Sequence, residues 1–218
     1  MALPTKLFDY ELPPEAVAQH PAQKRDHSKL LVIHRDTGKV EHRHFYELPE
    51  VLTGKCVLFR NNAKVIKARM FLKRATGGEV ELLLLRPSTD ALKWWCLAKP
   101  LKKIVVDEVI FFGEERVAIL REKSKTGEAL FEFAKSPLEL SERVGHLPLP
   151  PYIAHADGDE DATRYQTVYA KEPVAAAAPT AGLHFTPELI AKLENMGQHF
   201  VDVTLHVGLD TFRPIMTE

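Results

Sequence analysis

The spacing of apolar and polar positions divides the chain into three stretches with different predicted structures. The first predicts a short helix over 15–19, a hairpin with strands over 29–33 and 40–45, and a second short helix over 48–53. The middle stretch, from Lys55 to Phe133, consists of short β-type runs that no helical pattern interrupts. These runs predict strands over 55–59, 65–72, 79–85, 93–97, 105–112, 116–120 and 130–133. Glycine or proline separates them about every 10 residues, which is typical of a barrel or sandwich.

Helix signals return after the strand-rich middle. Ser136 is followed by Pro137, and Thr186 by Pro187, and each pair predicts an N-cap and the first turn of a helix. The remaining elements are predicted as a helix over 162–169, preceded by a run of acidic residues, and a buried strand over 200–207.

The simplest topology that joins these stretches is an α/β domain carrying an inserted all-β barrel domain. We assign residues 1–64 and 136–218 to the α/β domain and residues 65–135 to the barrel. The length of 218 residues is consistent with one or two domains of ordinary size, each able to form its own core.

Composition is that of an ordinary globular protein. Apolar residues make up 45% of the chain and charged residues 27%, and 29 basic residues oppose 30 acidic ones. The formal net charge of −1 excludes a globally basic nucleic-acid-binding protein but leaves room for a local basic face. No apolar run reaches the length of a membrane span and no signal peptide is recognisable, so we predict a cytoplasmic protein. Cys56 and Cys96 are predicted to be reduced, buried thiols.

Basic residues are concentrated in two of the predicted β segments. Residues 55–74 contain seven lysines and arginines and no acidic residue, and residues 92–105 contain four lysines and no acidic residue. If these segments pair, they form a basic face suited to a phosphate backbone; an ordinary solvated strand face is the alternative. Trp94 and Trp95 are adjacent on a strand, so one is predicted to point inward and the other outward.

Motifs for common ligand chemistries are missing from the sequence. It contains no phosphate-binding loop, no dinucleotide-binding glycine pattern and no nucleophile elbow. His42 and His44 share one face of a predicted strand, but no third ligand lies at a helpful spacing, so we predict no metal site.

The unusual stretch is 175–185, which reads AAAAPTAGLHF. Small residues let a backbone approach a ligand closely, and Gly182 permits a positive φ. His184 lies just before the cap at Thr186, where the positive end of a helix favours a neutral imidazole. A tight turn with a structurally satisfied histidine is the alternative. His206 and Gly208 end the next predicted strand, a position where α/β proteins often carry ligand groups.

Six stretches carry a resemblance to a known family, in that family's order and spacing. They are Phe8–Leu31, Asn61–Arg69, Gly145–Ile153, Arg164–Ala170, Ala178–Thr186 and Thr204–Gly208. Together they resemble the S-adenosylmethionine:tRNA ribosyltransferase-isomerase family over essentially the whole chain. The resemblance implies an α/β domain with an inserted β-barrel, in line with the pattern of apolar positions.

The same resemblance implies a reaction. The family moves the ribosyl part of S-adenosylmethionine onto 7-aminomethyl-7-deazaguanine in the tRNA anticodon and rearranges it to epoxyqueuosine, with release of adenine and methionine. S-adenosylmethionine is then a co-substrate, the anticodon region of tRNA is the partner, and neither a metal nor a membrane is implied.

The chemistry of that reaction suggests roles for particular side chains. The sulfonium acidifies the adjacent ribose methylene, which requires a base, and adenine leaves more readily when an acid protonates it. We assign His184 and His206 to these contacts. The expected S-adenosylmethionine-binding residues are Tyr165, Gln166, Tyr169, Thr180, Gly182, Phe185 and Gly208, and the expected contacts to substrate or tRNA phosphate are Asn62, Lys64 and Arg69.

The sequence also departs from the family pattern. Ala63, Lys67 and Asp210 replace the usual threonine, proline and glycine, and the family's C-terminal segments are absent, so we expect a C-terminally truncated, incomplete α/β domain. Two alternatives to the enzyme therefore stay open: a non-catalytic relative that binds tRNA or another RNA, and an inactive structural remnant. Possible partners include a complementing C-terminal fragment or a second copy of the chain, paired through an exposed edge strand over 200–207.

Overall fold

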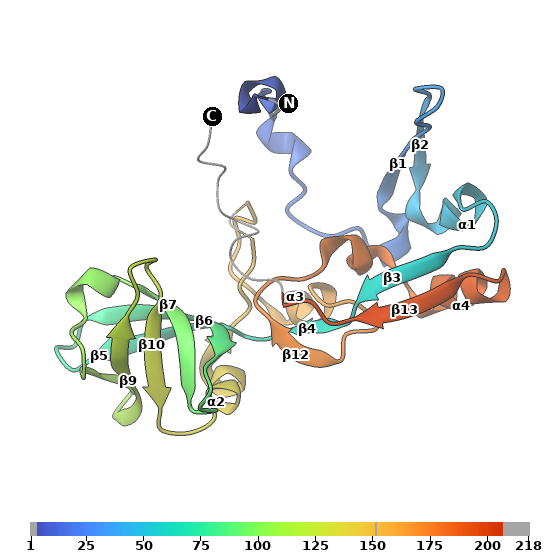
Figure 1. Cartoon of the computed structure of the whole chain (residues 1–218). Helices are drawn as coiled ribbons and strands as arrows, with labels where there is room; N and C mark the ends of the chain where they lie inside the picture. The colour runs from blue at the N-terminus through green and yellow to red at the C-terminus, as the bar shows by residue number, and fades with distance from the viewer. Residues whose placement is uncertain (1–3, 151, 207–218) are drawn as a thin grey trace.

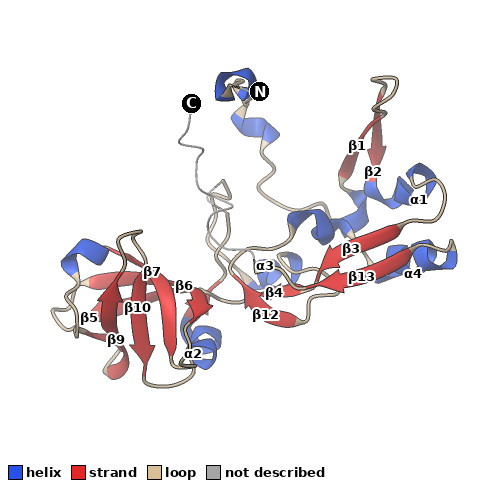
Figure 2. Cartoon of the chain, viewed as in Figure 1, coloured by secondary structure: helices blue, strands red, loops and turns tan. Residues whose placement is uncertain are grey.

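The computed structural model describes residues 4–150 and 152–206 and has two lobes (Figure 1). One lobe is a closed β-barrel with a helix against it, and we call it the barrel lobe. The other contains, among the described residues, three two-stranded sheets with short helices around them, and we call it the α/β lobe (Figure 2). The expected fold, an α/β domain with an inserted barrel, is confirmed.

The barrel is an antiparallel sheet that closes on itself. In the order of their hydrogen bonding, its strands are β5 (Arg69–Arg74), β6 (Glu79–Pro87), β7 (Lys93–Lys99), β10 (Ala129–Phe133), β9 (Glu115–Lys123) and β8 (Val109–Phe112). Strand β8 pairs again with β5, with Lys73 opposite Phe111, and this pairing closes the ring. Closure leaves no open sheet edge. The short strand β11 (Gly145–His146) pairs with β5 as an addition to the ring.

Alternating side chains fill the barrel. Met70 and Leu72 on β5 and Phe131 on β10 are at most 2% exposed, because every second residue of a strand points to the same face. On β7, Trp94 is buried and Trp95 is partly exposed, which confirms that one indole points inward and its neighbour outward.

Two of the strands predicted around the barrel have different bounds in the structure. The predicted run 65–72 divides into β4 (Ala63–Val65), which belongs to the α/β lobe, and β5. Between them the Ile66 amide donates to the Ala175 carbonyl, so the chain crosses from one lobe to the other there. The predicted strand 105–112 begins only at Val109, because Asp107 has a φ of 65° and turns the chain.

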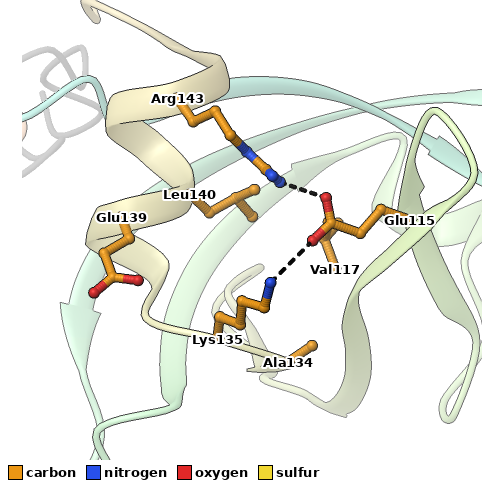
Figure 3. A pocket seen from close by; sticks show the side chains of 7 residues that line it. All are labelled: Glu115, Val117, Ala134, Lys135, Glu139, Leu140 and Arg143. Atoms are coloured by element: carbon orange, nitrogen blue, oxygen red, sulfur yellow. Dashed lines mark hydrogen bonds and ion pairs between the residues drawn. The ribbon is translucent and has the colours of Figure 1, made fainter.

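Helix α2 (Pro137–Val144) packs on the barrel (Figure 3). Its N-cap is the expected one, because the Ser136 hydroxyl accepts from the Glu139 amide. Leu140 joins the barrel core, and Glu115 of β9 accepts from Arg143 at 2.6 Å beside a small cavity of about 170 Å³. The contacts of this helix are therefore with the barrel, and the domain boundaries after residue 64 and before residue 136 remain predictions.

The α/β lobe is built from three strand pairs. The expected hairpin is present as β1 (Lys29–Ile33) and β2 (Val40–His44), and the parallel pairs are β3 (Val57–Asn61) with β13 (His199–Val203) and β4 with β12 (Glu172–Ala175). Strand partners in the two parallel pairs are more than 100 residues apart in sequence. Residues before and after the barrel therefore fold together.

The helices of this lobe are short. The α-helices are α1 (Leu48–Val51), α3 (Asp159–Arg164) and α4 (Pro187–Asn195), and the 3-10 helices of the chain lie at Thr5–Phe8, Pro14–Ala16, Arg25–His27, Phe45–Glu47, Leu101–Lys103 and Thr180–His184. The Thr186 hydroxyl accepts from the Leu189 amide at 3.1 Å, which confirms the predicted cap of α4. No helix among residues 4–150 and 152–206 is long and apolar enough to cross a membrane.

Three predicted elements of this lobe are wrong in extent. The helix predicted over 15–19 is a single 3-10 turn at Pro14–Ala16. The helix predicted over 162–169 is α3, which ends at Arg164 because the Gln166 side chain instead binds the distant Val65 backbone. The strand predicted over 200–207 is β13, which ends at Val203; residue 207 lies outside the described residues.

Candidate active site

A cavity of about 280 Å³ opens where four segments of the α/β lobe meet. These segments are 18–28 near the N-terminus, 149–155, the end of α3, and the 3-10 turn at 180–184. Among the expected site residues, His184, Tyr165 and Thr180 line this cavity. Residues far apart in sequence are therefore brought to one place, and the AAAAPTAGLHF stretch supplies one wall.

His184 is held in its neutral form. Burial of its imidazole lowers its pKa, and the nearby Arg25 guanidinium lowers it further, although a contact with the Arg25 backbone opposes the shift. Its ring also packs at 5.3 Å from the ring of Phe45. The sequence attributed a neutral imidazole to the N-terminus of the following helix, whereas burial is the larger cause in the structure.

Arg25 and Arg164 tie the walls of the cavity together. Arg25 donates to the carbonyls of Thr163 (2.6 Å), Leu183 (3.1 Å) and Arg164 (3.2 Å). Arg164 donates in return to two carbonyls of the N-terminal segment, Ala22 (2.6 Å) and Gln23 (2.9 Å). The two guanidinium groups thus fix the backbone next to His184, since each of these bonds has a charged donor.

His155 also lines this cavity, and its pKa is shifted in the opposite direction to that of His184. Hydrogen bonding to the Ala156 carbonyl raises its pKa against the effect of burial, with further support from the Gln19 carbonyl and from Asp161. One cavity therefore contains one histidine with a lowered pKa and another with a raised pKa, and opposite shifts of this kind are typical of acid–base sites.

Gln166 has a structural role. Its side-chain carbonyl accepts from the Val65 amide at 3.0 Å, and its side-chain amide donates to the Val65 carbonyl at 2.6 Å. It thereby extends the edge of β4 like an added strand residue. Val65 itself belongs to a small apolar core with Leu149 and Tyr165 that underlies the cavity.

Tyr169 and Phe185 lie in an aromatic cluster and are not among the cavity-lining residues. The Arg60 guanidinium lies 4.8 Å from the centre of the Tyr169 ring and 5.1 Å from that of Phe200. Phe185 makes edge contacts with Phe200 at 6.0 Å and with Tyr169 at 6.5 Å. Burial raises the pKa of Tyr169, so its hydroxyl stays protonated.

Gly182 is needed because another side chain of this protein lies very close to it. Its φ is not positive, so the positive φ that a glycine permits is not used here. A Cβ at this position would overlap the Tyr169 hydroxyl and approach the Thr167 methyl group within 2.9 Å. The missing side chain therefore leaves room for Tyr169, which packs directly against the turn that presents His184.

Gly182→Ala is expected to destabilise the protein by about 1–3 kcal/mol, because the added methyl group forces Tyr169 out of its place. Chemical denaturation measures this change. Gly158→Ala is the matched control, because the nearest atom to its Cβ is 3.9 Å away. Adding Tyr169→Phe to Gly182→Ala removes the overlapping oxygen and should restore part of the loss; no recovery would show that the overlap is not the cause.

The other expected site residues lie away from the cavity or are engaged elsewhere. His206 is exposed and does not line the cavity, and Gly208 and Asp210 lie outside the described residues. Asn62 is 9% exposed and accepts from the Thr204 hydroxyl at 2.7 Å, which fastens the end of β3. Lys64 is exposed on β4, and Arg69 forms an ion pair with Glu81 at 3.1 Å.

The two basic segments do not pair into one face. Strand β6 lies between β5 and β7 and places Glu81 opposite Lys99 on one side and next to Arg69 on the other. Arg60 and Arg74 form ion pairs with Asp202 and Glu108. Acidic residues from neighbouring segments thus neutralise much of the run that is basic in sequence.

Metal-binding side chains are not clustered in the described ranges, where no group of three or more His, Cys, Asp or Glu residues is placed to bind a metal ion. His44 instead lies 3.7 Å from Glu47, and both cysteines are free. Burial strongly raises the pKa of the Cys96 thiol, which lies inside the barrel.

Sequence reasoning missed several polar residues that line the cavity, among them His20, Arg25, His155 and Asp161. The first two lie within the N-terminal stretch that carries the family resemblance. The other two lie between two further stretches, His155 in a loop and Asp161 in α3. No chemical motif marks them, because their proximity arises only when segment 18–28 folds onto residues 149–164.

By its fold, this protein is an α/β protein that carries a closed β-barrel. The α/β lobe contains a cavity lined by histidines. The model of a family described as "Queuosine biosynthesis protein" matches residues 5–218. The chain therefore belongs to the queuosine biosynthesis protein family, and the resemblance seen in the sequence is confirmed.

Individual relatives agree with this assignment. Two curated relatives, each named S-adenosylmethionine:tRNA ribosyltransferase-isomerase, come from Moorella thermoacetica (48% identical over 217 residues) and Thermotoga maritima (44% identical over 211 residues). Each match covers 97% of this chain and 62% of the relative. The crystal structure of S-adenosylmethionine tRNA ribosyltransferase from Thermotoga maritima is 33% identical, covers 93% of this chain and 59% of that one, and has a TM-score of 0.38. The chain thus spans about 62% of the length of these curated relatives.

Proposed function

We propose that this chain takes part in transferring the ribosyl group of S-adenosylmethionine to 7-aminomethyl-7-deazaguanine in tRNA and isomerising it to epoxyqueuosine. The main support is a half-buried histidine, His184, on the wall of a cavity in a chain that aligns over 97% of its length with relatives named for that reaction. S-adenosylmethionine is the proposed co-substrate, the tRNA anticodon region the proposed partner, and the cytoplasm the proposed place of action.

His184 fits the role of base in this proposal. The sulfonium makes the adjacent ribose methylene acidic, so the reaction needs a group that can accept its proton. Because burial and Arg25 lower the pKa of His184, its imidazole is neutral at pH 7 and can accept one. Tyr165 and Thr180 line the same cavity and are the proposed contacts to the adenosyl group. The cavity, about 280 Å³, is close to the range of small-molecule sites, roughly 300–1,000 Å³.

The remaining site residues divide into two groups in this proposal. Gln166, Tyr169, Gly182 and Phe185 act indirectly, because they hold the turn and strand that present the cavity-lining side chains. His206 and Gly208 are proposed contacts from the segment after β13, and Lys64 is the proposed phosphate contact that remains exposed. A complementing C-terminal fragment or a second copy of the chain is proposed as a protein partner.

Binding of S-adenosylmethionine, measured by isothermal titration calorimetry, tests the proposed function. Saturable binding that is lost in His184→Ala and Thr180→Ala but kept in His199→Ala, an exposed histidine on β13, would support it. Binding of tRNA without S-adenosylmethionine binding, with a steep dependence on salt, would favour the non-catalytic RNA-binding alternative. Binding of neither ligand would leave the structural-remnant alternative.

A further inference from the structure

One wall of the cavity is a segment with no apolar anchor. Residues 18–28, which we call the wall segment, contribute Gln19, His20 and Arg25 to the cavity lining. None of the described residues from 4 to 28 is buried. Because burial of apolar side chains is the main force that fixes a segment to a core, the position of the wall segment depends on polar contacts.

Gln19 makes these contacts at one end of the wall segment. Its side-chain amide donates to the Tyr152 carbonyl at 3.0 Å, and its side-chain carbonyl accepts from the Ala154 amide at 2.8 Å. Its backbone carbonyl lies 3.1 Å from Nε2 of His155. Three contacts of one residue thus join the wall segment to loop 152–155, which also lines the cavity.

The position of His155 determines its protonation state. Its Nε2 lies 3.1 Å from the Gln19 carbonyl, and its Nδ1 lies 2.9 Å from the Ala156 carbonyl. A carbonyl oxygen only accepts hydrogen bonds, and a neutral imidazole has one N–H donor. Only the doubly protonated imidazolium makes both bonds, so a neutral ring would leave one nitrogen lone pair facing an oxygen.

We propose that His155 is a positioning residue of the cavity, which as an imidazolium helps to hold the Gln19 end of the wall segment and loosens that end when the ring loses a proton, while Arg25 and Arg164 hold the rest of the segment at any pH. The proposal rests on the proposed function in one respect, because it treats this cavity as the substrate site. His155 acts on substrate only through the wall segment, and His184 remains the proposed base.

The surroundings of His155 favour the charged ring. Asp161 lies 3.8 Å from Nδ1, and Glu160 adds further negative charge. The ring of His20, the other titratable group in contact, stacks on His155 with centroids 5.2 Å apart and planes 7° from parallel. The pKa of His155 is raised above its usual value, in agreement with this geometry.

The sign of the pH effect follows from that direction. A histidine whose pKa is raised on folding contributes its full stabilisation below its ordinary pKa of about 6.5 and loses it as pH rises through the raised value. The Gln19 end of the wall segment should therefore be fixed in mildly acidic solution and loosen above neutral pH. His184 has a lowered pKa and titrates below this window, so the two effects are separable.

NMR on the ligand-free chain tests the proposal. The ring of His155 should titrate above about 6.5. Backbone order parameters over residues 18–20 should fall from about 0.85 to below about 0.6 between about pH 5.5 and about pH 8.5. Those of residues 22 and 23, whose carbonyls accept from Arg164, should stay unchanged. In His155→Gln those of residues 18–20 should stay at the lower value throughout, because glutamine offers no charged donor.

Two matched variants complete the test. His20→Phe keeps an aromatic ring against His155 without a titrating group, so the pH dependence should persist. His146→Gln removes a histidine paired with Asp157 in the same region but away from the wall segment, and should match the unaltered protein. The proposal is overturned by a His155 pKa at or below about 6.5, by order that does not change with pH, or by pH dependence that survives in His155→Gln.

Ligand binding separates this proposal from the proposed function. The affinity for S-adenosylmethionine should fall about tenfold over the same pH window in the unaltered chain and stay flat in His155→Gln, since bonds with a charged donor are worth about that much. If S-adenosylmethionine binds but the backbone order parameters do not change with pH, only the role of His155 is refuted. If the order parameters change with pH as expected but S-adenosylmethionine does not bind, only the proposed substrate is refuted. Should His155→Gln fail to fold, the titrations of the unaltered chain and of His20→Phe still decide the question.

Discussion

His184→Ala is expected to lower the release of adenine from S-adenosylmethionine in the presence of tRNA by about 10²–10⁴-fold. The physical reason is that a positioned acid or base contributes about this factor to proton transfer. The neutral imidazole of His184 is held at the cavity wall by burial and by the backbone contacts of Arg25. Adenine release is measured by chromatography with 7-aminomethyl-7-deazaguanine-containing tRNA, and near-normal turnover would refute the role.

The pH profile gives an independent check on the same side chain. Since the pKa of His184 is lowered, its imidazole loses its proton below the ordinary histidine value of about 6.5. The rate should therefore rise with pH below that value, and the titration of His184 should not change it further above that value. His199→Ala removes an exposed histidine from β13 and is the matched control with unchanged rate and profile. The same profile can be measured in His155→Gln, which removes the second cavity histidine with a shifted pKa. A rate that still rises with pH above neutral pH in this variant would assign the base to a group other than His184.

Phe131→Ala is expected to destabilise the barrel lobe by about 3–5 kcal/mol, a large part of the total stability of about 5–15 kcal/mol. Phe131 is completely buried and lies on β10, between β7 and β9, so its loss leaves a cavity that the closed ring cannot collapse to fill. Guanidinium denaturation followed by tryptophan fluorescence measures the change, because Trp94 lies in the same core.

Phe71→Ala is the matched control for this substitution. Phe71 lies on β5 of the same barrel but is 57% exposed, and its ring contacts only the edge of His146 at 5.4 Å among the described ring pairs. Its loss should cost less than about 1 kcal/mol, since little surface is removed from the core. Equal losses in the two variants would mean that burial in the barrel does not set the stability.

Much of the local structure was predictable, because its causes are local. Ser136 and Thr186 cap α2 and α4 as expected, since an N-cap needs only a side-chain oxygen three residues before the amide it accepts from. The hairpin β1–β2 and the strands of the barrel followed from alternation and from the breaks between runs. The elements that failed, such as the C-terminal part of the helix over 162–169, were overridden by bonds to distant residues such as Val65.

The candidate site was predictable only in part. His184, Tyr165 and Thr180 were recognised from their stretches and do line one cavity. Arg25 and His155 were not, because an arginine or a histidine has no local signal that separates a surface side chain from a cavity wall. The basic run over 55–74 predicted a basic face for a similar reason. The sequence does not show that the neighbouring strand β6 brings Glu81 beside Arg69.

The sequence by itself determined the family, the caps, the strand-rich middle and the stretch that carries His184, because these depend on the identity and spacing of neighbouring residues. Tertiary structure alone decided which residues share the cavity, in which direction the pKa of each of two histidines shifts, and which basic side chains meet acidic ones. Those properties depend on burial and on distances between segments more than 100 residues apart, such as Arg25 and Leu183. Desolvation and hydrogen bonding shift a pKa only once the chain has folded.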